Sequence, residues 1–512
     1  MKKRWVKLLL VLATVLAVLC LRFLISSVHS KDAVNRYKEK LRAAGEILDS
    51  NELIPPHVDP EKNGLEYFNE AFRLVPHPMA GMLSSNPPPA MKMMASGKAM
   101  VGWQQPEIID DSTNSWADLE QELQSESSGM DFLRRAAGRP QLNFELAYSQ
   151  GAYLPLPHLI RMKNAAMMLS PAVLADLHRG NSASAATNLH ALLLMVNVWK
   201  DEPILISQLV RIAIASIAFN AQWEFLQATN ITDEQLAMLE NDWTNARFVQ
   251  PMENALVMER AWASLNIQKL RTSTSPSSTY AGMFGSSSAR SGSGDWLDTI
   301  KDVGASAKRK TSDTLWHFSW SYDDELNVLQ GEQVLIESAR QIRTDGYFKN
   351  ALAYRDRQFA ALGLARPGTN WLRDQLDDVL AGLGPESVQS VAHVLDRLMA
   401  YETFRTLATS AIALKRYQLR HGTLPPALTA LVPEFLSEVP RDPADGNPLR
   451  YRVNPNGAFL LYSVGKDGID DGGDPTAAPG STSTQLQRGR DWVWPQPATA
   501  EEIQKFYDNL PK

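Results

Sequence analysis

The clearest structural pattern in this chain is the stretch Arg441–Asp474, RDPADGNPLRYRVNPNGAFLLYSVGKDGIDDGGD. Within it, two runs rich in β-forming residues, Leu449–Val453 and Ala458–Tyr462, flank the tetrapeptide Asn454-Pro455-Asn456-Gly457. Asparagine, proline and glycine suit the tight geometry of a chain reversal, in which some residues adopt positive φ angles. This pattern therefore predicts a β-hairpin.

Four aspartates follow the second run and are interleaved with glycines: Asp467, Asp470, Asp471 and Asp474. Closely spaced carboxylates repel one another unless water or a cation lies among them, and glycines allow carboxylate and carbonyl oxygens to converge on a calcium ion. The spacing is not that of an EF-hand, because the glycine and the distal glutamate fall at other positions. The residues alone leave two interpretations, a calcium site and a solvated acidic turn.

A further set of residues with a characteristic order and spacing runs from about Thr406 to Trp494. The set comprises Ala411, Ile412, Leu414, Tyr417, His421–Pro425, Leu428, Leu431-Val432, Pro440–Pro443, Gly446–Pro448, Tyr451 and Leu461–Gly468. By these residues the segment resembles the globular head of the major pseudopilin of type II secretion systems, the GspG family. The resemblance covers less than a fifth of the chain.

In the GspG family the last loop of the head binds a calcium ion. The resemblance implies that this loop supplies side-chain and backbone-carbonyl ligands here, with two further aspartates as additional or substitute ligands. The implied set is Asp467 and Asp474, the carbonyls of Val464 and Ile469, and the candidates Asp470 and Asp471. The acidic pair that closes the family's loop is Asp474-Pro475 in this chain, so one expected carboxylate is missing.

The N-terminus departs from the pseudopilin pattern, which has a short leader, a processing site and an apolar helix with an early glutamate. Here Met1-Lys2-Lys3-Arg4 precedes the apolar run Leu8–Leu21, which contains no acidic residue. The head-like segment therefore stands at the C-terminal end of another kind of protein, and fibre assembly is not expected.

The apolar run continues past Arg22, so its length approaches the roughly 20 residues that span a bilayer. The lysines and arginine before it predict a cytoplasmic N-terminus and a single-pass protein of the cytoplasmic membrane with its bulk on the periplasmic side. A cleaved signal peptide ending near Val28-His29-Ser30 is the alternative, and the apolar residues beyond Arg22 favour the uncleaved anchor. Cys20 is the only cysteine, so no internal disulfide supports the exported part.

Composition limits the classes of partner. The chain has 512 residues, a formal net charge of −6 and 44% apolar residues, which is ordinary for globular domains. Nucleic acid is not expected as a partner, because phosphate binding requires concentrated lysine and arginine. The expected partners are the membrane, through the N-terminal helix, and other envelope proteins.

Helix-end signals divide the middle of the chain. Ser170-Pro171 predicts a helix start, Arg179-Gly180-Asn181 predicts a helix end, and Thr232–Gln235 has the pattern of a capping box. The segment Glu202–Leu226 is apolar enough to suggest a membrane span.

Three polar residues, Gln208, Arg211 and Asn220, interrupt that apolar segment, so a buried core helix is the better interpretation. Arg211 could bind an anionic ligand, but a structural arginine paired with a nearby carboxylate is the commoner arrangement. Farther along, Arg271–Gly294 is rich in Ser, Gly and Thr and predicts a flexible linker.

We therefore expect a mainly α-helical protein with an N-terminal transmembrane helix and a small C-terminal α+β head that contains a β-hairpin. The expected divisions are an anchor or signal peptide (1–30), a helical, Pro/Met-rich connecting region (31–112), a helical domain (113–265), a Ser/Gly-rich linker (266–294), a second helical region (295–405), the head-like calcium-binding domain (406–494) and a tail (495–512).

Familiar catalytic motifs are absent from the sequence. The nine histidines include no His-Glu-x-x-His pair, and there is no Walker loop, dinucleotide fingerprint or Gly-x-Ser-x-Gly elbow. Paired carboxylates such as Asp110-Asp111, or Glu120 with Glu122, could act as acid and base, although such pairs are commonly solvated. The sequence favours a membrane-anchored envelope protein acting in protein interaction, assembly or secretion, with an exported hydrolase as the alternative.

Overall fold

The protein is described here from a computed structural model, which covers residues 14, 28–75, 89–108, 115–284, 308, 310–364, 385–455, 457–477 and 483–508. It is mainly helical and carries a small C-terminal sheet of antiparallel strands, so the predicted fold class is confirmed at this level. Most of the predicted N-terminal span, residues 1–30, lies outside the described residues.

The helices make up the body of the molecule. Residues 28–43 are helical. The named α-helices are α2 (Leu65–Leu74), α4 (Trp116–Ser125), α5 (Ser127–Ala137), α6 (Pro157–His178), α7 (Ser182–Asn197), α8 (Leu205–Leu226), α9 (Asp233–Asn245), α10 (Val249–Thr272), α11 (Pro276–Phe284), α13 (Ser321–Asp345), α14 (Lys349–Ala361), α16 (Pro385–His421) and α17 (Ala500–Asp508). Short helical turns are η1 (Ser50–Leu53), η2 (Gly102–Gln104), η3 (Tyr148–Tyr153), η4 (Trp316–Trp320), η6 (Leu428–Leu431) and η7 (Leu486–Arg488).

Two small sheets join distant parts of the chain. One sheet has the order β1 (Lys92–Ala95), β2 (Lys98–Met100), β6 (Gln496–Pro497), with β6 parallel to β2. The other has the order β3 (Arg450–Val453), β4 (Phe459–Ser463), β5 (Trp492–Val493), and both of its pairings are antiparallel.

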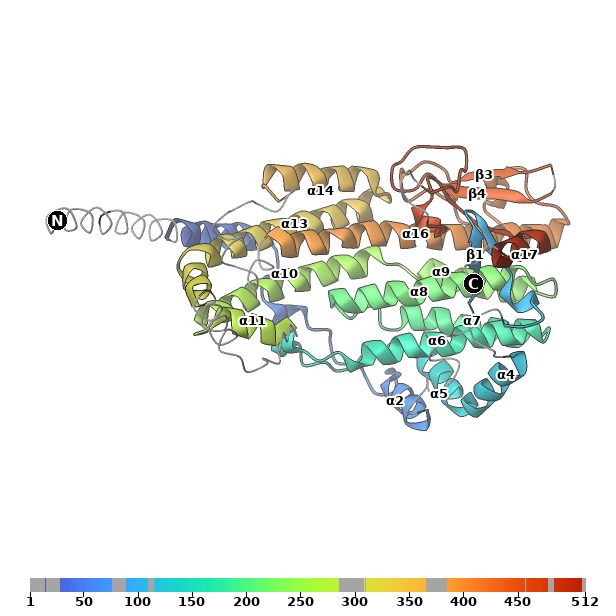
Figure 1. The fold of residues 1–512 in the computed structure, drawn as a ribbon, viewed down its shortest axis with the longest axis horizontal. Helices are drawn as coiled ribbons and strands as arrows, with labels where there is room; N and C mark the ends of the chain where they lie inside the picture. Colours follow the sequence, from blue (N-terminus) through green and yellow to red (C-terminus); the bar gives the residue numbers. More distant parts are fainter. Residues whose placement is uncertain are drawn as a thin grey trace.

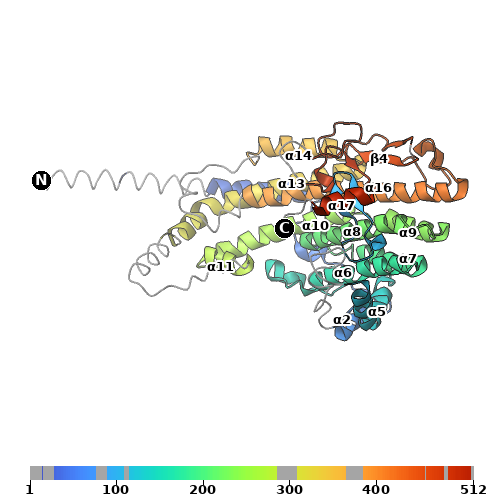
Figure 2. The ribbon, with the colours of Figure 1, turned by 45° about the vertical axis from the view of Figure 1, so that its right-hand side comes forward.

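The long helices run along an elongated body (Figure 1). Helices α13 and α16 lie side by side in both views, and β3 and β4 lie along the C-terminal half of α16 (Figure 2). Helices α6, α7 and α8 form the adjoining layer, with α2, α4 and α5 on its outer side. The C-terminal sheet is therefore seated on the helical body.

One hydrophobic cluster connects these layers. It extends from Phe68 on α2, through Trp223 on α8 and Leu407 on α16, to Leu461 and Trp494 beside the C-terminal sheet. Helix α16 also crosses the expected boundary at residue 406 without interruption. The head-like segment and the helical body thus share a core.

Helix α8 is the one helix, among those in the described part of the chain, long and apolar enough to cross a membrane. More than half of its most apolar window, 56%, is buried inside the protein, against α6, α7, α10 and α16. The prediction of a buried core helix is confirmed. The predicted N-terminal span lies outside the residues that allow the same test.

The predicted hairpin, capping box and helix end are confirmed. Strands β3 and β4 pair from Arg450–Tyr462 to Val453–Phe459, and Gly457 has a φ of 80° in the turn. Thr232 and Gln235 form both hydrogen bonds of the capping box of α9. Helix α6 ends at His178, and Asn181 caps α7 by accepting a hydrogen bond from the Ser184 amide.

The prediction of a linker at residues 266–294 is wrong for its first part. Helix α10 continues to Thr272, and α11 follows from Pro276. The reason is long-range: Arg271 donates to Glu325 at 2.7 Å and stacks on the Tyr322 ring at 3.8 Å, which holds the end of α10 to α13. Residues 285–294 lie outside the described residues.

Two other local predictions differ from the structure. Pro171 lies inside α6 and does not start it; the helix begins at Pro157, and proline at the first position needs no amide donor. The connecting region contains the β1–β2 hairpin, which was not predicted. Its signal was Ser96-Gly97 between two short apolar runs, with Gly97 at a φ of 71°.

Candidate functional site

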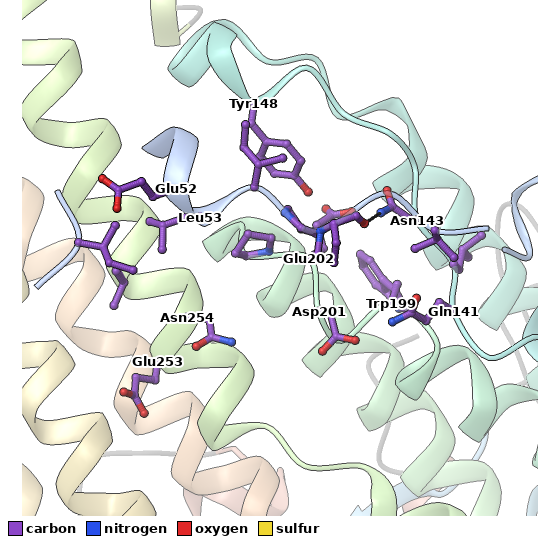
Figure 3. A pocket seen from close by; sticks show the side chains of 18 of the residues that line it. Glu52, Leu53, Gln141, Asn143, Tyr148, Trp199, Asp201, Glu202, Glu253 and Asn254 are labelled. Carbon is purple, nitrogen blue, oxygen red and sulfur yellow. Dashed lines mark hydrogen bonds between the residues drawn. The ribbon is translucent and has the colours of Figure 1, made fainter. Parts of the chain in front are cut away.

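A groove of about 640 Å³ opens where four segments from distant parts of the chain meet beside Arg340 of α13 (Figure 3). These are the segment after helix 28–43, the stretch before and within η3, the turn between α7 and α8, and α10. Its lining includes Glu46, Glu52, Leu53, Pro55, Pro56, Gln141, Asn143, Tyr148, Trp199, Asp201, Glu202, Pro203, Glu253, Asn254 and Arg340.

Buried aromatic rings give the groove a fixed floor. The Trp199 ring is 2% exposed, and its Nε1 donates to the Met195 carbonyl at 2.8 Å. Tyr148 is also buried and lies 6.5 Å from the Trp262 ring, centroid to centroid. Burial, and then the charge of Glu202, raises the pKa of Tyr148, so its hydroxyl stays protonated and can donate a hydrogen bond.

Two of the lining carboxylates are neutralised by arginines. Glu46 Oε2 accepts from Arg260 at 3.0 Å, and Glu253 accepts from Arg340 at 3.0 Å and from Arg343 at 2.9 Å. Burial by itself would raise the pKa of Glu46, but hydrogen bonds from Arg340 and other neighbours outweigh it and lower that pKa to about 2. These carboxylates therefore fix α10, α13 and the N-terminal segment to one another.

Glu202 is a buried carboxylate with two side-chain partners. The Nε2 of His158 lies 3.0 Å from its Oε1, and the hydroxyl of Ser207 donates to the same oxygen. A catalytic triad places the histidine between the serine and the acid. Here serine and histidine both contact the acid, so the cluster is not arranged to activate Ser207.

Asp201 and Glu52 are the lining acids that stay open to solvent. Both are exposed, and the described residues give neither carboxylate an ion-pair partner. In Figure 3, Asp201, Asn254 and Trp199 lie around the same opening. The groove thus combines exposed carboxylates, side-chain amides and a rigid aromatic floor, a combination that suits a cationic ligand. Asp201 also acts through its charge on the buried Arg211.

The loop predicted to bind calcium follows β4, and its glycines adopt the expected conformations. Gly465, Gly468, Gly472 and Gly473 have φ angles of 65°, 69°, 73° and 85°. Glycine is required for two of them, because a Cβ on Gly465 would lie 2.9 Å from the Arg490 carbonyl, and a Cβ on Gly473 would lie 2.7 Å from Leu460.

The aspartates of this loop have partners within the protein. Asp467 accepts from the Ile469 amide at 3.0 Å, and Asp474 accepts from the Thr476 amide at 3.0 Å. Asp470 accepts from the Tyr462 hydroxyl at 2.9 Å. The hydrogen bond to the backbone amide lowers the pKa of Asp474, so this carboxylate stays ionised.

Arginines supply positive charge to the loop. Arg450 lies 3.6 Å from Asp470, while Arg490 lies 3.5 Å from Asp471 and 3.8 Å from Asp474. Within the described residues, no three His, Cys, Asp or Glu side chains form a group that could hold a metal. The six predicted ligands share one loop, but a calcium ion would require Asp474 and Asp471 to turn away from Arg490.

Asp491 is a carboxylate of this loop that sequence reasoning missed. It is fully buried, its Oδ2 accepts from the Gly473 amide at 2.7 Å, and its Oδ1 has no hydrogen-bond partner. Burial raises its pKa. The orphaned oxygen is the kind of group that a cation would satisfy, and it lies far in sequence from Pro475, which stands where the family's second closing carboxylate was expected.

Other sequence candidates have structural roles or lie outside the described residues. Arg211 is fully buried and donates to the carbonyls of Val196 and Arg247, both at 2.6 Å, while the carboxylates Glu402 and Asp201 act on it through their charge without a direct ion pair in the described residues. Glu120 lies 3.9 Å from Arg179 on the surface. Asp110 and Asp111 are outside the described part of the chain.

No local motif identified the groove, because its lining comes from residues 45–58, 141–148, 198–203, 253–257 and 340, which are adjacent only after folding. Comparisons of the sequence and structure with protein-family models, curated proteins and solved structures gave no match.

Proposed function

We propose that this protein is a membrane-anchored component of the cell envelope that binds a positively charged segment of a partner protein in the groove between helix 28–43, η3, α8 and α10. The observation that carries the proposal is the pair of exposed carboxylates, Asp201 and Glu52, which have no ion-pair partner among the described residues and lie at the edge of a cavity floored by Trp199 and Tyr148. The volume, about 640 Å³, is within the usual range of ligand pockets, roughly 300–1,000 Å³.

Charge and shape together favour a polypeptide. The side-chain amides Gln141, Asn143 and Asn254 line the same groove and can pair with a peptide backbone. A lysine or arginine side chain can lay its aliphatic part on an apolar floor while its head meets exposed acids. The neighbouring Glu46 and Glu253 already have arginine partners, so the open charge is concentrated at Asp201 and Glu52.

The location of the protein is part of the proposal. The positively charged N-terminus and the apolar run Leu8–Leu21 support a single-pass anchor in the cytoplasmic membrane, with the body in the periplasm. The pseudopilin-like segment 406–494 then acts as a rigid end of the body and not as a fibre subunit, because its core is continuous with α8 and α16.

We also propose that calcium binds the loop after β4, with Asp467, Asp474 and the carbonyls of Val464 and Ile469 as ligands and Asp470 or Asp471 as substitutes. The partnerless Oδ1 of Asp491 supports this proposal, since a buried anionic oxygen without a donor is costly. Calcium would compete with Arg490 for Asp471 and Asp474, which lie 3.5 Å and 3.8 Å from its guanidinium.

The alternative, an exported hydrolase, rests on Glu202, which has buried histidine and serine neighbours at the groove. We place it second because His158 and Ser207 contact the same carboxylate and not each other in a relay. A hydrolase would lose activity with Glu202→Gln, whereas binding of a basic peptide depends on Asp201 and Glu52.

The binding proposal is tested with the full-length protein in detergent. Isothermal titration with a lysine-rich peptide should give an affinity that weakens about tenfold, or about 1.4 kcal/mol, in the double variant Asp201→Asn, Glu52→Gln. A matched double variant, Glu438→Gln with Glu501→Gln, removes the same charge from exposed positions outside the groove and should bind as the wild type does. If both double variants bound the peptide equally weakly, net charge alone would explain the effect, and the groove would be rejected as the binding site.

The partner itself can be captured in cells. A photoreactive residue placed at Asn254, which lines the groove, should crosslink to a protein with a basic segment, and the crosslink should be lost in the Asp201→Asn, Glu52→Gln background. The same photoreactive residue at Glu438, an exposed residue that does not line the groove, controls for random encounters. Crosslinks that persist without the two acids would contradict the proposal.

A further inference from the structure

A second, separate cavity of about 210 Å³ lies between the end of α8, the C-terminal part of α16, the β3–β4 turn and the segment that contains β6. It shares no lining residue with the groove. Its lining comprises Leu226, Gln227, Ala411, Lys415, Gln418, Leu424, Gly457, Ala458, Phe459, Trp494, Pro495, Gln496 and Pro497.

Lys415 is the one charged residue in that lining, and the described residues give its ammonium no hydrogen-bond or ion-pair partner. Its neighbours on α16 differ in this respect. Arg416 pairs with Asp233 at 2.7 Å, and Arg420 pairs with Asp233 at 2.5 Å and with Glu434 at 2.6 Å. Carboxylates thus pair with Arg416 and Arg420, whereas none among the described residues pairs with Lys415 in the cavity.

The half-buried position of Lys415 makes the missing partner significant. Desolvation by burial lowers its pKa, because the charged ammonium loses water without gaining a counter-ion. Among the described residues, no side-chain oxygen of the lining glutamines Gln227, Gln418 and Gln496 accepts a hydrogen bond from this ammonium. An anion in the cavity would restore the favourable environment of the ammonium.

Much of the remaining lining of the cavity is apolar. Leu226, Ala411, Leu424, Phe459 and Trp494 contribute hydrocarbon or aromatic surface to it. Gln418 and Gly457, which also line it, are exposed, so the cavity is in contact with solvent. A ligand that fits this division has one anionic end and one apolar end.

We propose that this cavity binds a small organic carboxylate, with its charge at Nζ of Lys415 and its apolar part between Phe459 and Trp494. A single carboxylate matches the single cation, whereas a doubly charged phosphate would leave one charge uncompensated in a half-buried site. The volume is below the usual range of roughly 300–1,000 Å³ for drug-sized ligands, which restricts the occupant to a small molecule.

Benzoate and benzamide provide a matched pair of probes, because they have nearly the same shape and differ in charge. Titration calorimetry with the full-length protein in detergent, near neutral pH, should show benzoate binding at least about tenfold more tightly than benzamide. Lys415→Met should abolish that preference. Lys163→Met, which removes an exposed lysine of α6, should keep it.

Proton uptake gives a second measurement that does not require a variant. A bound carboxylate raises the pKa of the adjacent lysine, so benzoate binding at about pH 9 should take up protons and benzamide binding should not. This can be measured from the dependence of the binding heat on the ionisation enthalpy of the buffer. It decides the question even where Lys415→Met fails to fold.

The proposal is overturned if benzoate fails to bind, if benzamide binds as tightly, or if benzoate binding near pH 9 takes up no proton. It is also overturned if folded Lys415→Met keeps the wild-type preference. Because the groove and this cavity have no residue in common, a negative result at one leaves the other proposal standing.

Discussion

Glu224 of α8 is a fully buried carboxyl that fastens the β1–β2 region to the helical body. Its Oε1 accepts from the Met91 amide at 2.8 Å and from the Gly102 amide at 3.0 Å, across more than a hundred residues of sequence. Burial raises the pKa of Glu224 to about 8, although the backbone hydrogen bonds act in the opposite direction. Near neutral pH this carboxyl is therefore mainly protonated in the folded state.

This shift predicts a pH dependence of stability. The folded pKa lies above the ordinary value of 4.5, so the contribution of Glu224 is fully present below about pH 4.5 and is lost as the pH rises through about 8. Each pH unit between the unfolded and folded pKa values changes the free energy of unfolding by about 1.36 kcal/mol. From pH 6 to pH 8 the free energy of unfolding of the wild type should therefore fall by up to about 2.7 kcal/mol more than that of Glu224→Gln. Urea denaturation at the two pH values measures this. Glu438→Gln, an exposed control, should follow the wild type; parallel curves for Glu224→Gln would contradict the assignment.

The loop after β4 gives the second prediction for individual residues. Calcium that binds only the folded state raises the free energy of unfolding by about 2.7 kcal/mol at a hundredfold excess over its dissociation constant. The full-length protein should therefore melt at a higher temperature in calcium than in chelator, and Asp467→Ala or Asp491→Asn should remove most of that difference. Thermal unfolding followed by circular dichroism measures it.

The ion pairs near the loop decide which acidic residue can serve as the control for this experiment. Asp445 is unsuitable because it pairs with Arg450 at 2.6 Å, and Arg450 also faces Asp470. Glu438→Gln should leave the calcium effect intact. Identical melting in calcium and in chelator would show that Arg450 and Arg490 are the only cations that this loop requires.

Between elements, the crossing of α13 and α16 is a close contact that depends on a glycine. Gly331 is buried in α13, and a Cβ built on it would lie 2.4 Å from Cγ1 of Val388 at the start of α16. No Cβ fits at that distance without a shift of one helix. The glycine costs α13 about 1 kcal/mol of helix propensity relative to alanine and makes the close approach possible.

Gly331→Ala should therefore destabilise the protein by about 1–3 kcal/mol despite the higher helix propensity of alanine. Adding Val388→Ala removes the obstructing methyl groups, so the double variant should be more stable than the sum of the two single variants predicts. Chemical denaturation of the four proteins completes this cycle. A stabilised Gly331→Ala variant would mean that the helices are not in contact there.

Across the whole molecule, strands β5 and β6 return the C-terminal segment to the helical body. Trp492 and Trp494 are each 3% exposed, and the Trp223 indole of α8 donates to the Pro495 carbonyl at 2.8 Å. Beyond them, the Gln496 amide donates to the Gly97 carbonyl at 2.9 Å in the β2–β6 pairing. One short C-terminal segment thus joins the head-like sheet, α8 and the β1–β2 hairpin.

Ending the chain after Arg490 should consequently destabilise the entire body, not the head-like segment alone. Loss of a buried tryptophan side chain costs about 3–5 kcal/mol, and two such losses approach the whole stability of a typical domain, about 5–15 kcal/mol. Ending the chain after Thr499 keeps both tryptophans and β6 and removes α17, which has no buried residues, so that control should retain most of the stability. Calorimetry should show one main unfolding transition; a body transition unchanged by the longer truncation would contradict a shared core.

The sequence by itself determined the features that depend on neighbouring residues. The β3–β4 hairpin follows from Asn454–Gly457, the α9 capping box from Thr232 and Gln235, and the buried character of α8 from an apolar run with isolated polar residues. Each involves backbone geometry or periodicity within a few turns of chain, which short-range sterics and hydrogen bonding govern.

The tertiary structure alone decided what depends on distant residues. By sequence, Arg271 belongs to a serine-rich stretch that predicts a flexible linker. In the structure, its contacts with Glu325 and Tyr322 hold it in helix α10. The groove around Asp201 and the unpaired ammonium of Lys415 exist only because segments far apart in sequence pack side by side. Burial and charge pairing are set by those long-range contacts, and a single unaligned sequence carries no local pattern for them.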